Sequence, residues 1–152
     1  MEFSEKRKKT RIQSLRMLLL GSTVILLLVA LQFFGPARAD LWWQIFFEAL
    51  HAPLFGVIAV CLLAMTPSTW HWQARLLIAM AATLLLAIFS EAVQIPMPNR
   101  NASVGDIVND MVGAAAFISA AVVFSPSFHV PSGRGRWLIL FAVVLLIWPL
   151  KP

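Results

Sequence analysis

Long apolar runs separated by short polar segments make up most of the chain. Four runs, residues 17–34, 45–65, 74–95 and 104–124, are each about 18–22 residues long, enough for a helix to cross a bilayer. A fifth run, residues 137–150, is about 14 residues long and short for a full span, but we expect flanking Trp148 and Lys151 to help it cross. The pattern predicts an all-α membrane protein, a bundle of five transmembrane helices, or four if the last run lies in the interface.

Local signals place several helix ends. Pro96 and Pro98 stop the third run, because proline cannot continue the hydrogen-bond ladder of a helix. Ser103 with Asp106 three residues later resembles a capping box, so the fourth helix should begin near residue 104 or 105. Pro53 is expected in the first turns of the second helix, where a missing backbone donor does least damage. Small residues in the fourth helix predict close packing against a neighbouring helix. They are Gly113, Ala116 and Ala120.

Composition supports this class. Of the 152 residues, 60% are apolar and 12% are charged, against about 25% charged in soluble domains. The length allows one domain. Cys61, the single cysteine, lies inside an apolar run, which excludes an intramolecular disulfide and a cysteine-based zinc site. We expect no metal site and no cofactor.

The positive charge is concentrated at the N terminus. Residues 1–16 carry six of the twelve basic residues just before an apolar run, which is typical of a cytoplasmic segment held against anionic lipid. A terminal cluster of this kind is not a nucleic-acid-binding face, so we expect no nucleic-acid partner. The run that follows exceeds the ~7–15 residues of a signal-peptide core, which favours an uncleaved anchor over a cleaved signal.

With five spans and a cytoplasmic N terminus, nine of the twelve basic residues lie on the cytoplasmic side, as the positive-inside rule requires. We therefore expect a multi-pass protein of the cytoplasmic (inner) membrane. The start of the second span, the end of the third and the start of the fourth then share the outer face.

Polar residues gather in these three segments. Ionisable groups inside spans cost about 2.5–3.5 kcal/mol each on insertion scales, so such a group needs a partner or a function. The predicted functional cluster is His51, Glu91, Gln94, Arg100, Ser103, Asp106 and Asn109, with Glu48 and Asp110 as secondary candidates.

The order and spacing of these residues resemble the VanZ-like family of small polytopic bacterial membrane proteins. The matching positions are His51, Phe55 and Gly56, then Glu91-x-x-Gln94, a loop with Pro96 or Pro98 and Arg100, and Ser103-x-x-Asp106-x-x-Asn109 before Gly113. Asp110 and Phe117 depart from the pattern, which more often has an uncharged and a small residue there. The resemblance implies a VanZ-like transmembrane domain over residues 17–150 and a role in the cell envelope or in teicoplanin-type resistance.

Several functions stay open. The cluster could act at the outer face on a lipid-linked cell-wall intermediate or a lipophilic ligand. It could instead be a metal-independent enzyme for a lipid or isoprenoid phosphate, with His51 as base, Glu91 as acid and Arg100 on the phosphate. The chain could also be a transporter or an accessory subunit of a larger membrane complex, or form a homo-oligomer. A purely structural alternative has Arg100 bridging Glu91 and Asp106 as a clasp.

Overall fold

The computed structural model describes residues 2–33, 41–97, 102–124 and 137. Within these ranges every regular element is an α-helix. They are α1 (Glu2–Phe33), α2 (Leu41–Met65), α3 (Trp72–Gln94) and α4 (Val104–Phe124). The predicted all-α class is therefore confirmed for this part of the chain. The predicted fifth span, residues 137–150, falls outside the described residues except for Trp137, so the five-helix bundle stays a prediction.

Three of the described helices are long and apolar enough to cross a membrane. They are Thr10–Ala30 within α1, the whole of α3 and the whole of α4. The part of α2 with described side chains, Ala49–Met65, is also apolar but shorter. Helices suit lipid because they satisfy their own backbone hydrogen bonds. These features indicate an integral membrane protein.

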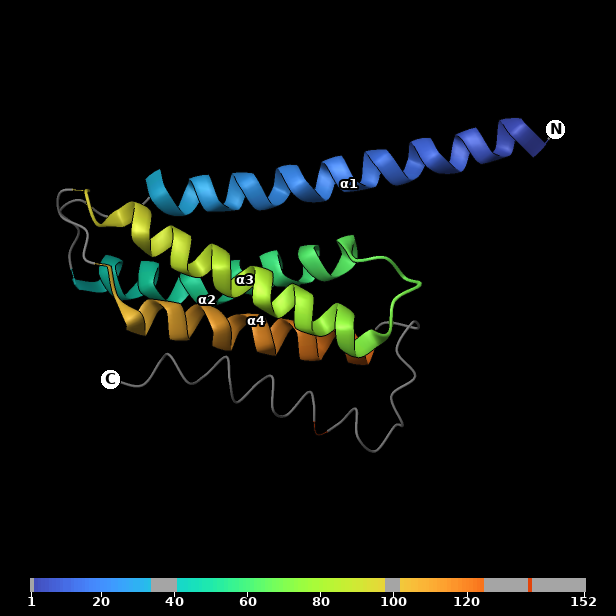
Figure 1. Ribbon diagram of the computed structural model, residues 1–152. Coiled ribbons are helices and arrows are strands. Elements are labelled where there is room, and N and C mark those ends of the chain that lie inside the picture. The colour runs from blue at the N-terminus through green and yellow to red at the C-terminus, as the bar shows by residue number, and fades with distance from the viewer. Residues whose placement is uncertain (1, 34–40, 98–101, 125–136, 138–152) are drawn as a thin grey trace.

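Consecutive helices run in alternating directions along the bundle (Figure 1). α2 lies at the centre, packing most extensively against α4 and also against α3 and α1. The alternation brings the start of α2, the end of α3 and the start of α4 to one end, which we call the polar end. The turn between α2 and α3, residues 66–71, lies at the opposite end together with Arg16 of α1, and we call this the basic end.

The first helix is longer than expected. α1 begins at Glu2 instead of residue 17, so the basic segment continues the first transmembrane helix. Residues 2–16 contain no glycine or proline and are rich in Lys, Arg, Glu and Gln, which are good helix formers. A helix of 32 residues is about 48 Å long, whereas the hydrocarbon core is about 30 Å thick. Its N-terminal part therefore extends past the other helices (Figure 1).

Pro53 does not lie in the first turns of its helix. α2 begins at Leu41, because the apolar and aromatic residues before the predicted start also join the helix, and this puts Pro53 in the helix interior. Proline has no backbone N–H, so the carbonyl of Ala49 lacks its helical donor. Membrane helices tolerate such a position where neighbouring groups satisfy the freed carbonyl.

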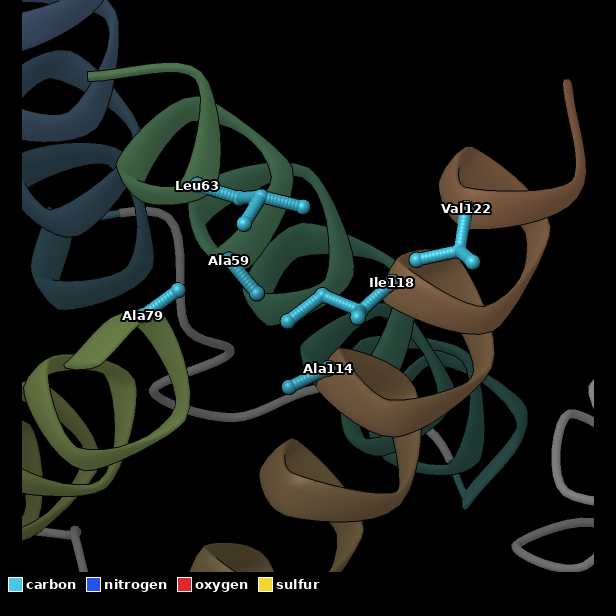
Figure 2. Close-up of a cluster of buried hydrophobic side chains, with 6 residues drawn as sticks. All are labelled: Ala59, Leu63, Ala79, Ala114, Ile118 and Val122. Carbon is cyan, nitrogen blue, oxygen red and sulfur yellow. The ribbon is translucent and has the colours of Figure 1, made fainter. Parts of the chain in front are cut away.

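Two apolar clusters hold the bundle together. One contains Phe55, Ile58 and Cys61 of α2, with Val24 of α1 and Ala87 of α3. The other joins α2, α3 and α4 nearer the basic end (Figure 2). Its members are Ala59, Leu63, Ala79, Ala114, Ile118 and Val122. Half of this second cluster is alanine, whose small side chain lets the helices approach closely.

The closest approach is between α2 and α4. A Cβ added to Gly113 would lie 2.7 Å from the Cα of Ala52 and closer still to that residue's carbonyl group, so only glycine fits there. One turn along, the ring of Phe117 lies against Gly56, where an added Cβ would lie 3.0 Å from Cε2 and nearer to other ring atoms. The predicted close packing is therefore confirmed at Gly113. Phe117 does not interrupt it, because Gly56 makes room for the ring.

Candidate functional site

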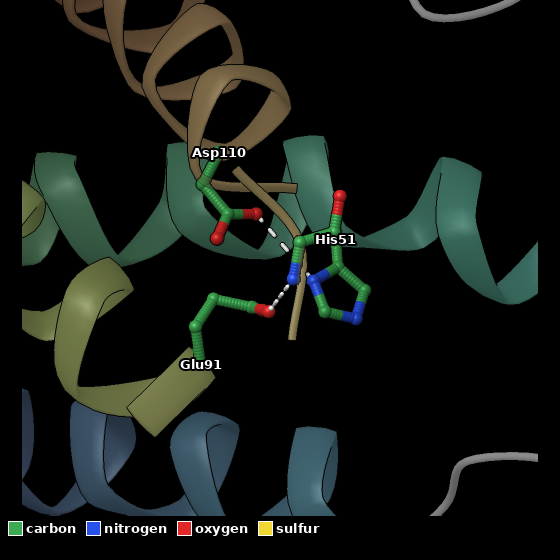
Figure 3. Close-up of polar contacts among 4 residues, drawn as sticks. His51, Glu91 and Asp110 are labelled. Carbon is green, nitrogen blue, oxygen red and sulfur yellow. Dashed lines mark hydrogen bonds and ion pairs between the residues drawn. The ribbon is translucent and has the colours of Figure 1, made fainter. Parts of the chain in front are cut away.

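A histidine and an aspartate meet inside the bundle at the polar end. His51 of α2 lies with Nδ1 3.5 Å from Oδ1 of Asp110 of α4, and the side chain of Asp110 is 0% exposed while that of His51 is 12% exposed. Figure 3 shows both side chains, with Glu91 of α3 directed toward the same region. Asp110 had been predicted only as a secondary candidate. The structure makes it the most buried acid of the described chain.

Helix packing explains why these two residues meet. His51 directly precedes Ala52, and Asp110 lies three residues before Gly113 on the same face of α4. The backbone contact between Ala52 and Gly113 therefore brings the histidine and the aspartate together. Residues 110 and 113 share a face by helical spacing, but only the glycine contact turns that face toward α2.

The pair compensates a costly burial. Moving a carboxylate out of water costs several kcal/mol of desolvation free energy unless an interaction with a partner offsets it. His51 is the partner that lies beside the Asp110 carboxylate. At 3.5 Å it is longer than the ~2.7–3.2 Å of a good N–H···O hydrogen bond. The contact is therefore a loose one, and it is an ion pair only when His51 is protonated.

A second buried acid joins the end of α3 to the start of α4. Glu91 is 4% exposed, and its Oε2 accepts a hydrogen bond of 2.8 Å from the backbone N–H of Ser103. The Oγ of Ser103 accepts a hydrogen bond of 3.0 Å from the N–H of Gly105, so Ser103 caps α4. The predicted start of α4 near residue 104 or 105 is confirmed, since the helix begins at Val104.

The capping box itself is built differently from the prediction. In such a box Asp106 would reach back to the N–H of Ser103. Glu91 of the preceding helix holds that N–H instead. A carboxylate at a helix N terminus is favoured by the helix dipole, and a charge-assisted hydrogen bond is stronger than a neutral one. Glu91 therefore provides a structural link between α3 and α4.

The other predicted residues surround these two contacts. Gln94 lies one turn after Glu91, is 3% exposed, and its Nε2 has no hydrogen-bond partner among the described residues. Asp106 and Asn109 of α4 are half-buried. Ser90, which is 2% exposed beside Glu91, was not among the predicted residues. Its position four residues before Gln94, on the same helical face, was the available signal.

Two predicted residues cannot be placed. Arg100 lies outside the described residues, so its bridge between Glu91 and Asp106 stays a prediction. Glu48 belongs to α2, but its side chain is outside the described part. Within the predicted cluster and its secondary candidates, His51 contacts Asp110 and Glu91 contacts Ser103.

The arrangement favours proton chemistry at His51. A carboxylate beside Nδ1 favours the tautomer with its proton on that nitrogen, which leaves Nε2 as an acceptor. A histidine base whose ring is oriented by a carboxylate is a recurring arrangement in catalytic sites. In the described part of the chain, no group of three His, Cys, Asp or Glu side chains is placed to hold a metal ion.

Comparison with known proteins finds no match for the chain among protein-family models, curated proteins or solved structures. The resemblance to the VanZ-like family therefore stays a prediction that rests on its motifs.

Proposed function

We propose that the chain is a VanZ-like integral membrane protein whose working site is the buried polar cluster at the polar end, formed around His51, Glu91, Gln94, Ser103 and Asp110. The observation that carries the proposal is the His51–Asp110 pair inside the helix bundle. Ionisable residues at such positions are expensive and usually mark a binding site, a proton path or a ligand counter-ion. A bundle that needed only apolar packing would not require them.

The distribution of charge supports an outward orientation of this site. In the described part of the chain, Glu91, Asp106 and Asp110 belong to the polar end, whereas Arg16 and Arg75 belong to the basic end. Positive residues favour the cytoplasmic side of a membrane. The polar end then faces the outside of the cytoplasmic membrane, where the cell wall is assembled and where glycopeptide antibiotics act.

The proposed role is in cell-envelope function, including resistance of the teicoplanin type. Two kinds of partner fit a polar site at the outer ends of apolar helices: a lipid-linked cell-wall intermediate and a ligand with a lipophilic tail. Each places its apolar chain in the bilayer and its polar group at the cluster. Asp110 and Gln94 are buried, so their side chains are already removed from water. A polar ligand could form hydrogen bonds with them in a site of low dielectric, where such bonds are stronger.

Drug susceptibility tests the proposal. A sensitive Gram-positive host would express the wild type, Asp110→Asn or Glu91→Gln, with membrane abundance matched by blotting, and growth would be measured in teicoplanin and vancomycin. Thr83→Val is the matched control, because Thr83 is equally buried but donates only within its own helix, to the carbonyl of Ala79 at 2.8 Å.

We expect the wild type and the Thr83→Val variant to protect against teicoplanin and not vancomycin, and both cluster variants to lose that protection. No protection by the wild type would refute the resistance role. Loss of protection in all three variants alike would refute a specific role for the polar end.

The second candidate function is a metal-independent enzyme for a lipid or isoprenoid phosphate, which the His51–Asp110 geometry favours. Here His51 acts as base and Asp110 orients it, while the Glu91 carboxylate is engaged with Ser103 and is better suited to holding the loop than to donating a proton. Mass spectrometry of a polyisoprenyl phosphate incubated with purified protein tests it. Turnover that His51→Gln abolishes would support the enzyme, and an unchanged substrate would exclude it for that lipid.

A further inference from the structure

Asp110 has unused hydrogen-bonding capacity inside the bundle. Its side chain is 0% exposed, and within the described chain neither Oδ1 nor Oδ2 has a hydrogen-bond partner. Nδ1 of His51 lies 3.5 Å from Oδ1 and likewise makes no hydrogen bond there. Buried polar groups of native proteins almost always have partners, so a buried carboxylate with none needs an explanation. A ligand that carries hydrogen-bond donors would supply the missing partner.

A second aspartate lies between this carboxylate and the start of α4. Asp106 is half-buried and lies four residues before Asp110, one turn away on the same face of the helix. Carboxylates at this spacing repel each other. Asp106 interacts electrostatically with Asp110 and with His51, and so does Glu91 of α3. Four side chains from three helices therefore act on one place.

The charge of this place is negative. Its described side chains are three carboxylates and one basic group, His51, which is charged only when it is protonated. Figure 3 shows the Asp110 carboxylate and the Glu91 side chain directed toward the same region beside His51. Like charges brought together cost free energy, so these side chains disfavour an anion and favour a cation.

An ammonium group suits these oxygens better than a metal ion. In the part of the chain that the structure describes, no group of three His, Cys, Asp or Glu side chains is placed to hold a metal. A primary ammonium group carries three N–H donors and no acceptor, so each donor can bind a separate oxygen. Hydrogen bonds from an ammonium group to a carboxylate are charge-assisted and about twice as strong as neutral ones.

We propose that Asp106 and Asp110 bind the primary ammonium group of an amphiphile, whose apolar chain lies in the bilayer beside the polar end. Carboxylates within membrane spans serve as ligand counter-ions in other proteins. The inference rests on the function proposed for the polar end, and it names the chemical class of the ligand there. A phosphate would meet the same carboxylates, so this class of ligand disfavours the second candidate function.

Lipid retention tests the site. The full-length protein would be purified in detergent and mixed with phosphatidylethanolamine or phosphatidylcholine of identical acyl chains, and bound lipid would be counted by native mass spectrometry. Both headgroups are zwitterionic, but the quaternary ammonium group of phosphatidylcholine has no N–H donor. We expect the wild type to retain phosphatidylethanolamine at least about fivefold better, and Asp110→Asn and Asp106→Asn to lose that preference. Glu5→Gln is the matched control, because it removes one negative charge from an exposed position in the N-terminal part of α1.

A single-chain amine distinguishes two sources of the ammonium group. Dodecylamine and dodecanol would be added as competitors to the complex with phosphatidylethanolamine. Displacement by dodecylamine and not by dodecanol would show that the site takes any ammonium group on an apolar chain. Displacement by neither, with the preference for phosphatidylethanolamine intact, would show that the site requires the headgroup of a phospholipid.

Three outcomes would overturn the proposal. One is equal retention of the two lipids by the wild type, and another is an equal loss of preference in Glu5→Gln, which would show diffuse attraction instead of a site. If Asp110→Asn does not fold, Asp106→Asn supplies the test at a half-buried position, and an unchanged preference in every folded aspartate variant is the third.

These outcomes are separate from those of the susceptibility experiment. A wild type that protects against teicoplanin but retains both lipids equally would refute only the ammonium ligand. A wild type that prefers phosphatidylethanolamine but gives no protection would refute only the resistance role.

Discussion

Replacing Gly113 with alanine is expected to separate α2 and α4 at the level of the His51–Asp110 pair. The new Cβ would lie 2.7 Å from the Cα of Ala52. Non-bonded carbon atoms prefer about 3.5–4.0 Å, so the helices must move apart by about 1 Å. The obstacle is backbone, which cannot swing aside as a flexible side chain does.

The size of the effect follows from two opposing contributions. Overpacking of a well-packed core costs about 1–3 kcal/mol. Alanine in a helix interior is more favourable than glycine by about 1 kcal/mol, which offsets part of the cost. The net loss in the free energy of unfolding should be up to about 2 kcal/mol. A shift of about 1 Å would also lengthen the 3.5 Å contact between His51 and Asp110 beyond the ~4 Å limit of an ion pair.

Unfolding in mixed micelles, followed by circular dichroism as the fraction of sodium dodecyl sulfate rises, measures this loss. Gly21→Ala is the matched control: Gly21 also lies inside a transmembrane helix, but a Cβ there meets no atom within 4 Å. It should stabilise the protein by up to about 1 kcal/mol. The two substitutions are therefore expected to change the free energy of unfolding in opposite directions. If Gly113→Ala stabilises the protein as Gly21→Ala does, the close α2–α4 contact is refuted.

Four further substitutions examine the polar end in the same unfolding assay. His51→Ala should lower the free energy of unfolding by about 3–5 kcal/mol, because Asp110 is left buried without its partner. Adding Asp110→Asn to this variant should restore part of the loss. Strictly additive losses would show that the two side chains do not interact. Ser103→Ala should cost about 1 kcal/mol by removing the acceptor for the N–H of Gly105, and no loss would contradict its capping role. Glu91→Gln should lower the free energy of unfolding by about 1 kcal/mol and speed hydrogen exchange at the Ser103 amide, because the hydrogen bond to that amide no longer has a charged acceptor. Unchanged exchange would argue against that hydrogen bond.

Much of the fold follows from local information in the sequence. The length of each apolar run and the residues at its ends predicted α3 and α4 to within about two residues, because spanning length and capping depend on neighbours in the chain. The start of α1 was missed by 15 residues, since a basic segment carries no apolar pattern even when it is helical. Alternating helix direction also predicted that His51, Glu91 and Ser103 would lie at one end.

The partners within that end could not be read from the chain. Helical spacing says which residues share a face of one helix, but it does not say how that face is rotated toward the next helix. The contact between Gly113 and Ala52 sets the rotation of α4 against α2, and so it makes Asp110 the partner of His51. The meeting of α3 and α4 likewise gives the Ser103 N–H to Glu91 and not to Asp106. Both results depend on shape complementarity between segments far apart in sequence, which exists only once the helices have packed.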